Sequence, residues 1–189
     1  MTSFFIGIAM CTQFAVLPAV DNITTEELRY TIEQVLSKSP RPELNSPEAV
    51  ELLLLTHAAE SIILGKAYRY QMNSGPAQGL FQMEPETEKD TWQHFLSFPA
   101  NKDLKQWVLS YASSAKPHLK DKQAPRDLIY NTAYQIAIAR IYYYRRGGRI
   151  PKQLKAQADF WKKHYNTYLG VGKQEVAIAK YNQFILGKP

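Results

Sequence analysis

The chain of 189 residues has the length of one domain and can bury a core without disulfide or metal staples. Its 45% hydrophobic and 21% charged residues are ordinary globular values, which exclude a disordered or collagen-like chain, and its single cysteine excludes an intramolecular disulfide and a multi-cysteine zinc site. The net charge of +6 favours a polyanionic partner, such as nucleic acid, anionic lipid or bacterial wall polymer, without choosing among them.

The N-terminal segment, residues 1–22, is mostly apolar. It carries no Lys or Arg, and the first one in the chain is Arg29, whereas a secretory signal begins with a positively charged region. Thr12 and Gln13 interrupt the apolar run, which is also short for a membrane-spanning helix. We expect this segment to pack on the domain or on a partner chain, and an uncleaved export or membrane-binding segment is the alternative.

Capping signals predict where the first two helices begin. Thr24, with Glu27 three residues later, has the pattern of a capping box, and the helix that it starts should reach about Lys38. Ser46 and Pro47 start a second helix, which should run to about residue 71. Further helices are expected over residues 85–98, 102–113, 125–146 and 151–168, and after residue 172.

The chain offers no convincing two-residue alternation of apolar and polar side chains, which is the pattern of a half-buried strand. It also contains no internal repeat and no low-complexity tract. We therefore expect one all-α domain of six or seven helices over residues 23–189, with at most a small β-hairpin around residues 79–83.

The second predicted helix carries the most informative residue. Residues 52–64 are apolar nearly all round, which is typical of a buried central helix, yet Glu60 lies in their middle. Burial disfavours the charged form of a carboxyl group and should raise its pKa. A glutamate that stays protonated near neutral pH is what a general acid requires. A buried glutamate held by a salt bridge or a helix N-terminus is the structural alternative.

Two further segments add to Glu60. Glu60-Ser61 is followed by a polar loop and then by residues 79–87, which have the pattern Gly-Leu-x-Gln-x-x-Pro-x-Thr. Tyr165-Asn166 comes later, and Asn131 gives a weaker match between them. In this order the segments resemble the lytic transglycosylase and goose-type lysozyme superfamily, although Phe81 replaces the usual Met and the glycine after Asn166 comes late. The resemblance spans roughly residues 50–180.

The resemblance implies a lysozyme-like fold and cleavage of the β-1,4 MurNAc–GlcNAc bond of peptidoglycan. Glu60 would act as acid and then as base, giving 1,6-anhydroMurNAc ends without a cofactor or metal. Ser61 would hydrogen-bond Glu60 or a developing charge, and Gln82 would orient the sugar. Tyr165 would sit near the acid. Asn166 would bind substrate beside it, and Met83 would line the groove, unless it belongs to the apolar core.

Several alternatives remain open. A hydrolytic muramidase of the same fold would need a second carboxylate, for which Glu84 and Glu86 are the best candidates, although helix-start roles explain the acids at residues 84–90. An inactive structural virion or wall-binding protein is another possibility. His57, one turn before Glu60, is expected to be a packed helix residue rather than a metal ligand, because no second His stands at the spacing of a zinc protease.

The expected partners are peptidoglycan glycan strands and, for a phage-encoded enzyme, other virion or tail proteins. The compact length favours such an enzyme, acting from the virion or in the host periplasm and cell wall. Nucleic acid is not required, although a basic patch could bind it. We expect that patch to be a solvated face; its members are Arg140, Arg145, Arg146 and Arg149.

Overall fold

The computed structural model describes residues 20–115, 127–167 and 170–188, and the apolar residues 1–19 lie outside this range. Within the described residues the chain is mostly helical, with eight α-helices and one small three-stranded sheet. The predicted all-α class with a small hairpin is therefore confirmed. Among the described residues, no helix has both the length and the apolar character needed to cross a bilayer.

The α-helices are α1 (Thr25–Ser37), α2 (Pro47–Ser61), α3 (Pro85–Thr91), α4 (Lys102–Leu109), α5 (Asp127–Tyr130), α6 (Thr132–Arg146), α7 (Leu154–Trp161) and α8 (Gln174–Lys180). Single π turns continue three of them, over Trp92–Leu96 after α3, Lys162–Asn166 after α7 and Tyr181–Ile185 after α8. Three 3₁₀ turns lie at Pro42–Leu44, Met72–Ser74 and Pro99–Asn101. The strands are β1 (Val20–Asp21), β2 (Ile62–Ile63) and β3 (Lys66–Tyr68), in the antiparallel order β1-β3-β2.

The predicted helix starts are confirmed at both capping sites. The Thr24 hydroxyl accepts the backbone N–H of Glu27 at 3.1 Å, and the Glu27 carboxylate accepts the backbone N–H of Thr24 at 2.9 Å. The Ser46 hydroxyl accepts the N–H of Ala49 at 3.1 Å, with Pro47 in the first helical position of α2. Each cap satisfies a backbone donor that the helix itself leaves free.

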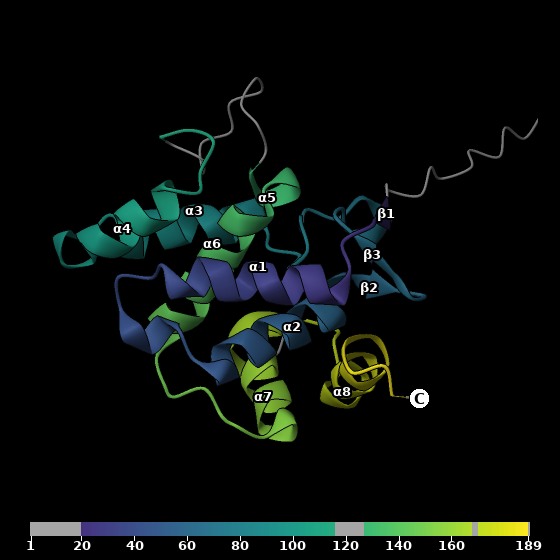
Figure 1. Cartoon of the computed structure of the whole chain (residues 1–189). Helices are drawn as coiled ribbons and strands as arrows, with labels where there is room; N and C mark the ends of the chain where they lie inside the picture. The colour runs from purple at the N-terminus through teal and green to yellow at the C-terminus, as the bar shows by residue number, and fades with distance from the viewer. Residues whose placement is uncertain (1–19, 116–126, 168–169, 189) are drawn as a thin grey trace, which may run out of the picture.

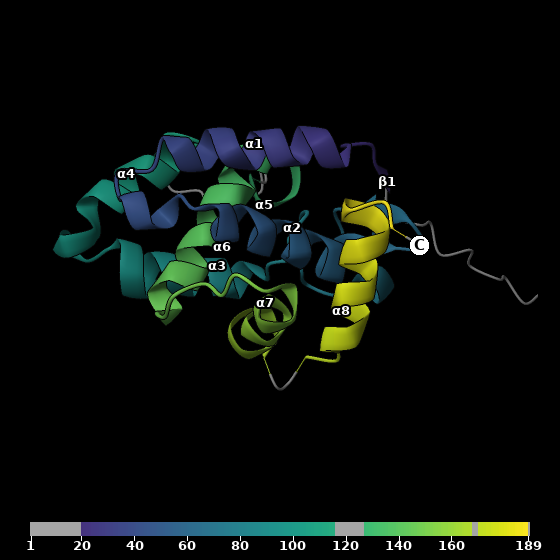
Figure 2. The ribbon, with the colours of Figure 1, turned by 60° about the horizontal axis from the view of Figure 1, so that its bottom comes forward.

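Helix α2 is the central helix, as its apolar sequence predicts. It packs against α1 on one side and against α7 and α8 on the other, and α6 also contacts it (Figures 1 and 2). The side chains of residues 52–55, four consecutive leucines, are completely buried. Burial of one leucine side chain is worth about 1.5–3 kcal/mol, so this helix contributes heavily to the core.

The C-terminal end of α2 differs from the prediction. The helix ends at Ser61, about ten residues earlier than expected, and the chain enters the hairpin of β2 and β3. Ile62 and Ile63 are β-branched and favour a strand. Leu64 and Gly65 then form the hairpin turn with φ of 49° and 77°, which a continuing right-handed helix cannot contain.

The hairpin expected at residues 79–83 is reduced to one isolated bridge between Gln78 and Met83, and the sheet lies elsewhere.

The long helix predicted over residues 125–146 is two helices. Asn131 separates them because its side chain accepts the backbone N–H of Tyr134 at 3.1 Å and so caps α6. The described residues accordingly hold eight α-helices, more than the six or seven expected.

Candidate active site

Glu60 lies on the last turn of α2 and is partly exposed. Its Oε1 atom accepts two hydrogen bonds, from the indole Nε1 of Trp161 at 2.9 Å and from the amide Nδ2 of Asn166 at 3.3 Å. No hydrogen bond to Oε2 is present among the described residues. One carboxyl oxygen is therefore held by two donors, and the other accepts no hydrogen bond from a described residue.

The surroundings of Glu60 favour its protonated form. Burial is the largest effect and raises the pKa of the Glu60 carboxyl. The hydrogen bonds from Asn166 and Trp161 and the charges of Lys180 and Lys162 oppose this rise without cancelling it. Because Oε1 is already an acceptor of two donors, the proton of the neutral acid belongs on Oε2, where it can be donated.

Lys162 fixes the orientation of Asn166. Its ammonium Nζ donates to Asn166 Oδ1 at 2.8 Å and to the Gly170 carbonyl at 2.7 Å. An ammonium group is only a donor, so the amide oxygen of Asn166 must face Lys162 and the amide nitrogen must face Glu60. Gly170 lies so close that a Cβ there would be 2.3 Å from the Asn166 carbonyl, which explains a glycine at this place.

Tyr165 joins this cluster to the segment of residues 79–83. Its hydroxyl donates to the Phe81 carbonyl at 2.9 Å, and its ring stacks on Tyr143 with 5.1 Å between centroids. Burial raises the pKa of Tyr165 well above its ordinary value, so Tyr165 stays a neutral donor. The three segments that carry the family resemblance are thus linked in space through Glu60, Asn166, Tyr165 and Phe81.

The segment of residues 79–83 is held rigidly by the helical domain. Gly79 has φ of 77°, and a Cβ on it would lie 2.0 Å from the Leu128 carbonyl, so only glycine fits. The backbone N–H of Leu80 donates to the side chain of Gln135 at 2.7 Å. The amide nitrogen of Gln82 donates within its own turn, to the Gly79 carbonyl at 2.8 Å, which leaves its side-chain oxygen without a described partner.

Two predicted substrate residues face elsewhere. Ser61 is buried and its hydroxyl bonds His57, at 2.8 Å to the ring Nδ1 and 3.0 Å to the carbonyl, rather than Glu60. One turn of helix separates Ser61 from His57, whereas adjacent residues such as Glu60 and Ser61 point apart. Met83 is 3% exposed and belongs to the hydrophobic core, so it lines no open groove.

His57 is the packed residue that the sequence favours. It is buried, and its Nδ1 also bonds the Leu80 carbonyl at 3.1 Å. Burial lowers the pKa of His57 to about 4, so the ring is neutral at physiological pH. Within the described residues, no group of three His, Cys, Asp or Glu side chains is arranged to hold a metal ion.

Sequence reasoning missed Trp161, which belongs to the candidate site, and the buried Glu88, which lies elsewhere in the core. Trp161 was not singled out, although it lies one helical turn before Tyr165 and so shares its face. Glu88 was grouped with the helix-start acids, yet it is 5% exposed and accepts a hydrogen bond from the Tyr134 hydroxyl. Its position one turn before the buried Trp92 is the signal that could have separated it from the exposed acids.

The predicted basic patch is not one solvated face. Arg140 is buried and donates to backbone carbonyls, Arg145 pairs with Asp90, and Arg146 donates to the Tyr142 hydroxyl. Arg149 is exposed. Arg146 is exposed like Arg149, but the expectation of one common solvated face is wrong for Arg140, which is buried, and for Arg145, which is half-buried against Asp90.

A groove above Glu60 was also expected. Two described cavities have volumes of about 350 and 250 Å³, and Glu60 lines neither of them.

No protein-family model matches the chain, and it matches no curated protein and no solved structure. The family resemblance therefore stays a prediction.

Proposed function

We propose that the chain cleaves the β-1,4 MurNAc–GlcNAc bond of peptidoglycan as a lytic transglycosylase, with Glu60 as its single acid and base. The observation that carries the proposal is the Glu60 carboxyl itself. Its Oε1 is held by Trp161 and Asn166, its Oε2 has no described partner, and burial raises its pKa. A general acid needs these three properties together.

In the proposed reaction, Glu60 donates its proton to the glycosidic oxygen, and the bond from that oxygen to the anomeric carbon breaks. The C6 hydroxyl of the same muramyl sugar then bonds to the anomeric carbon, and Glu60 takes the hydroxyl proton back. No water is consumed, and the cut strand ends in a 1,6-anhydro ring. The attacking hydroxyl belongs to the substrate, which favours it over bulk water.

The neighbours of Glu60 favour this route over hydrolysis. The groups that bond its carboxyl are an indole and an amide, and the charges that act on it come from lysines. An inverting hydrolase would need a carboxylate roughly 6.5–9.5 Å away as a base. The sequence candidates for that role, Glu84 and Glu86, are exposed at the start of α3, where Glu86 pairs with Lys89.

Replacing Glu60 by Gln should abolish release of muropeptides from purified cell wall. The amide can accept the same hydrogen bonds at Oε1, but it cannot deliver or recover a proton, and general acid–base catalysis typically contributes ~10²–10⁴-fold in rate. Glu84→Gln is the matched control and should keep its activity. Near-normal cleavage by Glu60→Gln would refute the mechanism. Wild-type protein that binds the wall without cleaving it would instead indicate a structural role.

The products separate the two reaction types. Mass spectrometry of the released muropeptides should find ends that lack one water relative to hydrolysis products. Exclusively reducing ends would show that water attacks. In that case Glu84→Gln or Glu86→Gln should abolish activity, and Glu60 would still be the acid.

A further inference from the structure

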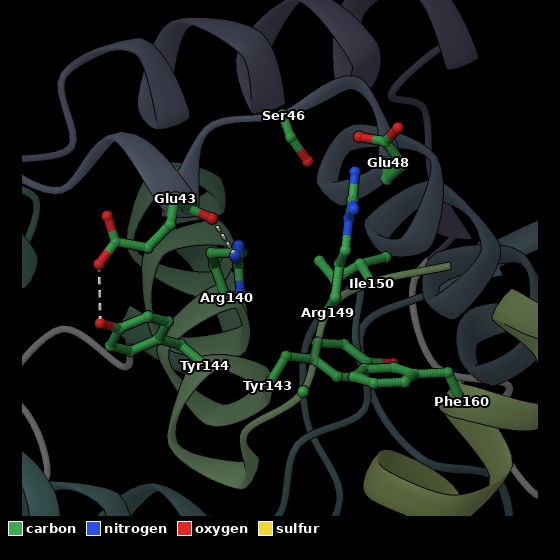
Figure 3. Close-up of a pocket in the computed structure, with 10 residues that line it drawn as sticks. Glu43, Ser46, Glu48, Arg140, Tyr143, Tyr144, Arg149, Ile150 and Phe160 are labelled. Atoms are coloured by element: carbon green, nitrogen blue, oxygen red, sulfur yellow. Dashed lines mark hydrogen bonds between the residues drawn. The ribbon is translucent and has the colours of Figure 1, made fainter. Parts of the chain in front are cut away.

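The larger cavity has no role in the proposed cleavage. Its volume is about 350 Å³, at the lower end of the range for small-ligand sites. It lies between the segment that leads into α2, the end of α6, the loop after α6 and the last turn of α7, and Figure 3 shows its lining. Charged side chains surround the opening, and the rings of Tyr143 and Phe160 form an aromatic wall.

Arg140 is the unusual residue of this cavity. It is 4% exposed, and its guanidinium donates to two backbone carbonyls, from Nε to Leu44 and from Nη2 to Glu43, each at 2.9 Å. Burial lowers the pKa of Arg140 to about 10, so the group is still cationic at neutral pH. The Glu43 carboxylate bonds the Tyr144 hydroxyl instead, at 2.9 Å.

Among the described residues, the buried guanidinium of Arg140 has no ion pair with a carboxylate. No hydrogen bond from its Nη1 is present among the described residues, although the side chain lines the cavity. A buried cation is costly unless an anion and hydrogen bonds compensate it. A ligand carboxylate in the cavity would supply both, through a charge-assisted hydrogen bond.

The rest of the lining defines the ligand further. Arg149 adds a second positive charge to that of Arg140, at the exposed edge of the cavity. Glu43 and Glu48 add two negative charges, so the four charged side chains of the lining have a net charge of zero. The pKa values of both acids are lowered, chiefly by backbone hydrogen bonds, which keeps them ionised. A ligand with both a carboxylate and an ammonium group matches this arrangement, with its apolar part against Phe160.

The cavity is connected to the candidate active site by stacked rings. Tyr143 stacks on Phe160 with 5.9 Å between centroids and on Tyr165 with 5.1 Å. Phe160 lines the cavity, and Tyr165 belongs to the cluster around Glu60. The buried ring of Tyr143 thus lies between Phe160 of the cavity and Tyr165 of the candidate active site.

We propose that this cavity binds a short peptide with free carboxylate and amino groups, the carboxylate on Arg140 and Arg149 and the amino group near Glu48. The identity of this peptide rests on the proposed function: it is the stem peptide of peptidoglycan, which branches from the muramyl sugar. The cavity would then select glycan strands that carry peptide over strands that are bare.

Binding can be measured without any cleavage. The probe is the glycan-free tripeptide L-alanyl-γ-D-glutamyl-L-lysine, added to the Glu60→Gln protein while the side-chain N–H resonances of its arginines are followed by NMR. The tripeptide should shift the Arg140 Nε–H resonance with saturation at millimolar concentration. Amidation of its carboxylates should weaken binding at least about tenfold, as for the loss of a charged hydrogen bond, and acetylation of its amino groups should also weaken it.

Variants at the exposed edge avoid damage to the core. Arg149→Gln should weaken tripeptide binding several-fold, whereas Lys155→Gln, which removes an exposed charge on α7 outside the cavity, should leave it unchanged. The proposal is overturned by any of three results. The amidated tripeptide binds as tightly as the unmodified one, acetate alone shifts the Arg140 resonance as much as the tripeptide does, or the tripeptide leaves the Arg140 resonance unshifted. If the tripeptide binds but the wild-type protein cleaves no cell wall, the peptide site stands and the proposed function falls.

Discussion

Glu88 should make the stability of this protein depend on pH, and Glu88→Gln should remove that dependence. The carboxyl is 5% exposed on α3 and accepts a hydrogen bond from Tyr134, whose hydroxyl in turn accepts from the Trp92 indole at 3.0 Å. Gln keeps the shape and an acceptor oxygen for Tyr134. The substitution therefore removes the ionisation of Glu88 and little else.

The magnitude follows from the pKa of Glu88, which is raised to about 7 from the ordinary 4.5, first by burial and then by the charge of Asp127. One pH unit between folded and unfolded pKa corresponds to about 1.4 kcal/mol. Because the folded pKa is the higher one, the native state holds its proton longer. This contribution is fully present below about pH 4.5 and is lost as pH rises through 7, for a total of about 3 kcal/mol.

Urea unfolding at a series of pH values measures this effect. At pH 4 to 5 the wild-type protein and Glu88→Gln should have similar free energies of unfolding, and by pH 8 to 9 the variant should be more stable by up to about 3 kcal/mol. Glu86→Gln, an exposed change on the same helix, should follow the wild-type curve. A difference between wild type and Glu88→Gln that is constant with pH would refute the reasoning.

Two further predictions concern the candidate site. Lys162→Met should raise the pKa of Glu60 further, because a nearby positive charge is lost. The alkaline limb of the pH–rate profile should therefore move to higher pH. Lys163→Met removes an exposed charge next to it and should leave the pH–rate profile unchanged. Gly79→Ala should cost several kcal/mol in urea unfolding, because positive φ costs about 1–2 kcal/mol and the backbone clash adds to it. Gly147→Ala has a similar φ and open space, so equal losses would contradict the clash.

Part of the candidate site could be predicted from local sequence. Glu60 was singled out because an acid stands within an apolar helix, and its raised pKa agrees with that inference. Tyr165 and Asn166 were placed beside it by the resemblance, and the contacts of Asn166 with Glu60 and of Tyr165 with Phe81 bring those segments together. Ser61 was misplaced, because neighbouring residues on a helix point in different directions, and its hydroxyl bonds His57, one turn earlier, instead of Glu60.

The sequence by itself determined the helical class, the capped starts of α1 and α2 and the central place of α2, because caps and apolar periodicity act between residues close in the chain. Only the tertiary structure decided which groups meet from distant segments. Trp161 reaches Glu60 across about one hundred residues, and Arg140 is buried against the turn before α2. Such contacts depend on how helices pack, and no local pattern in the sequence encodes that geometry.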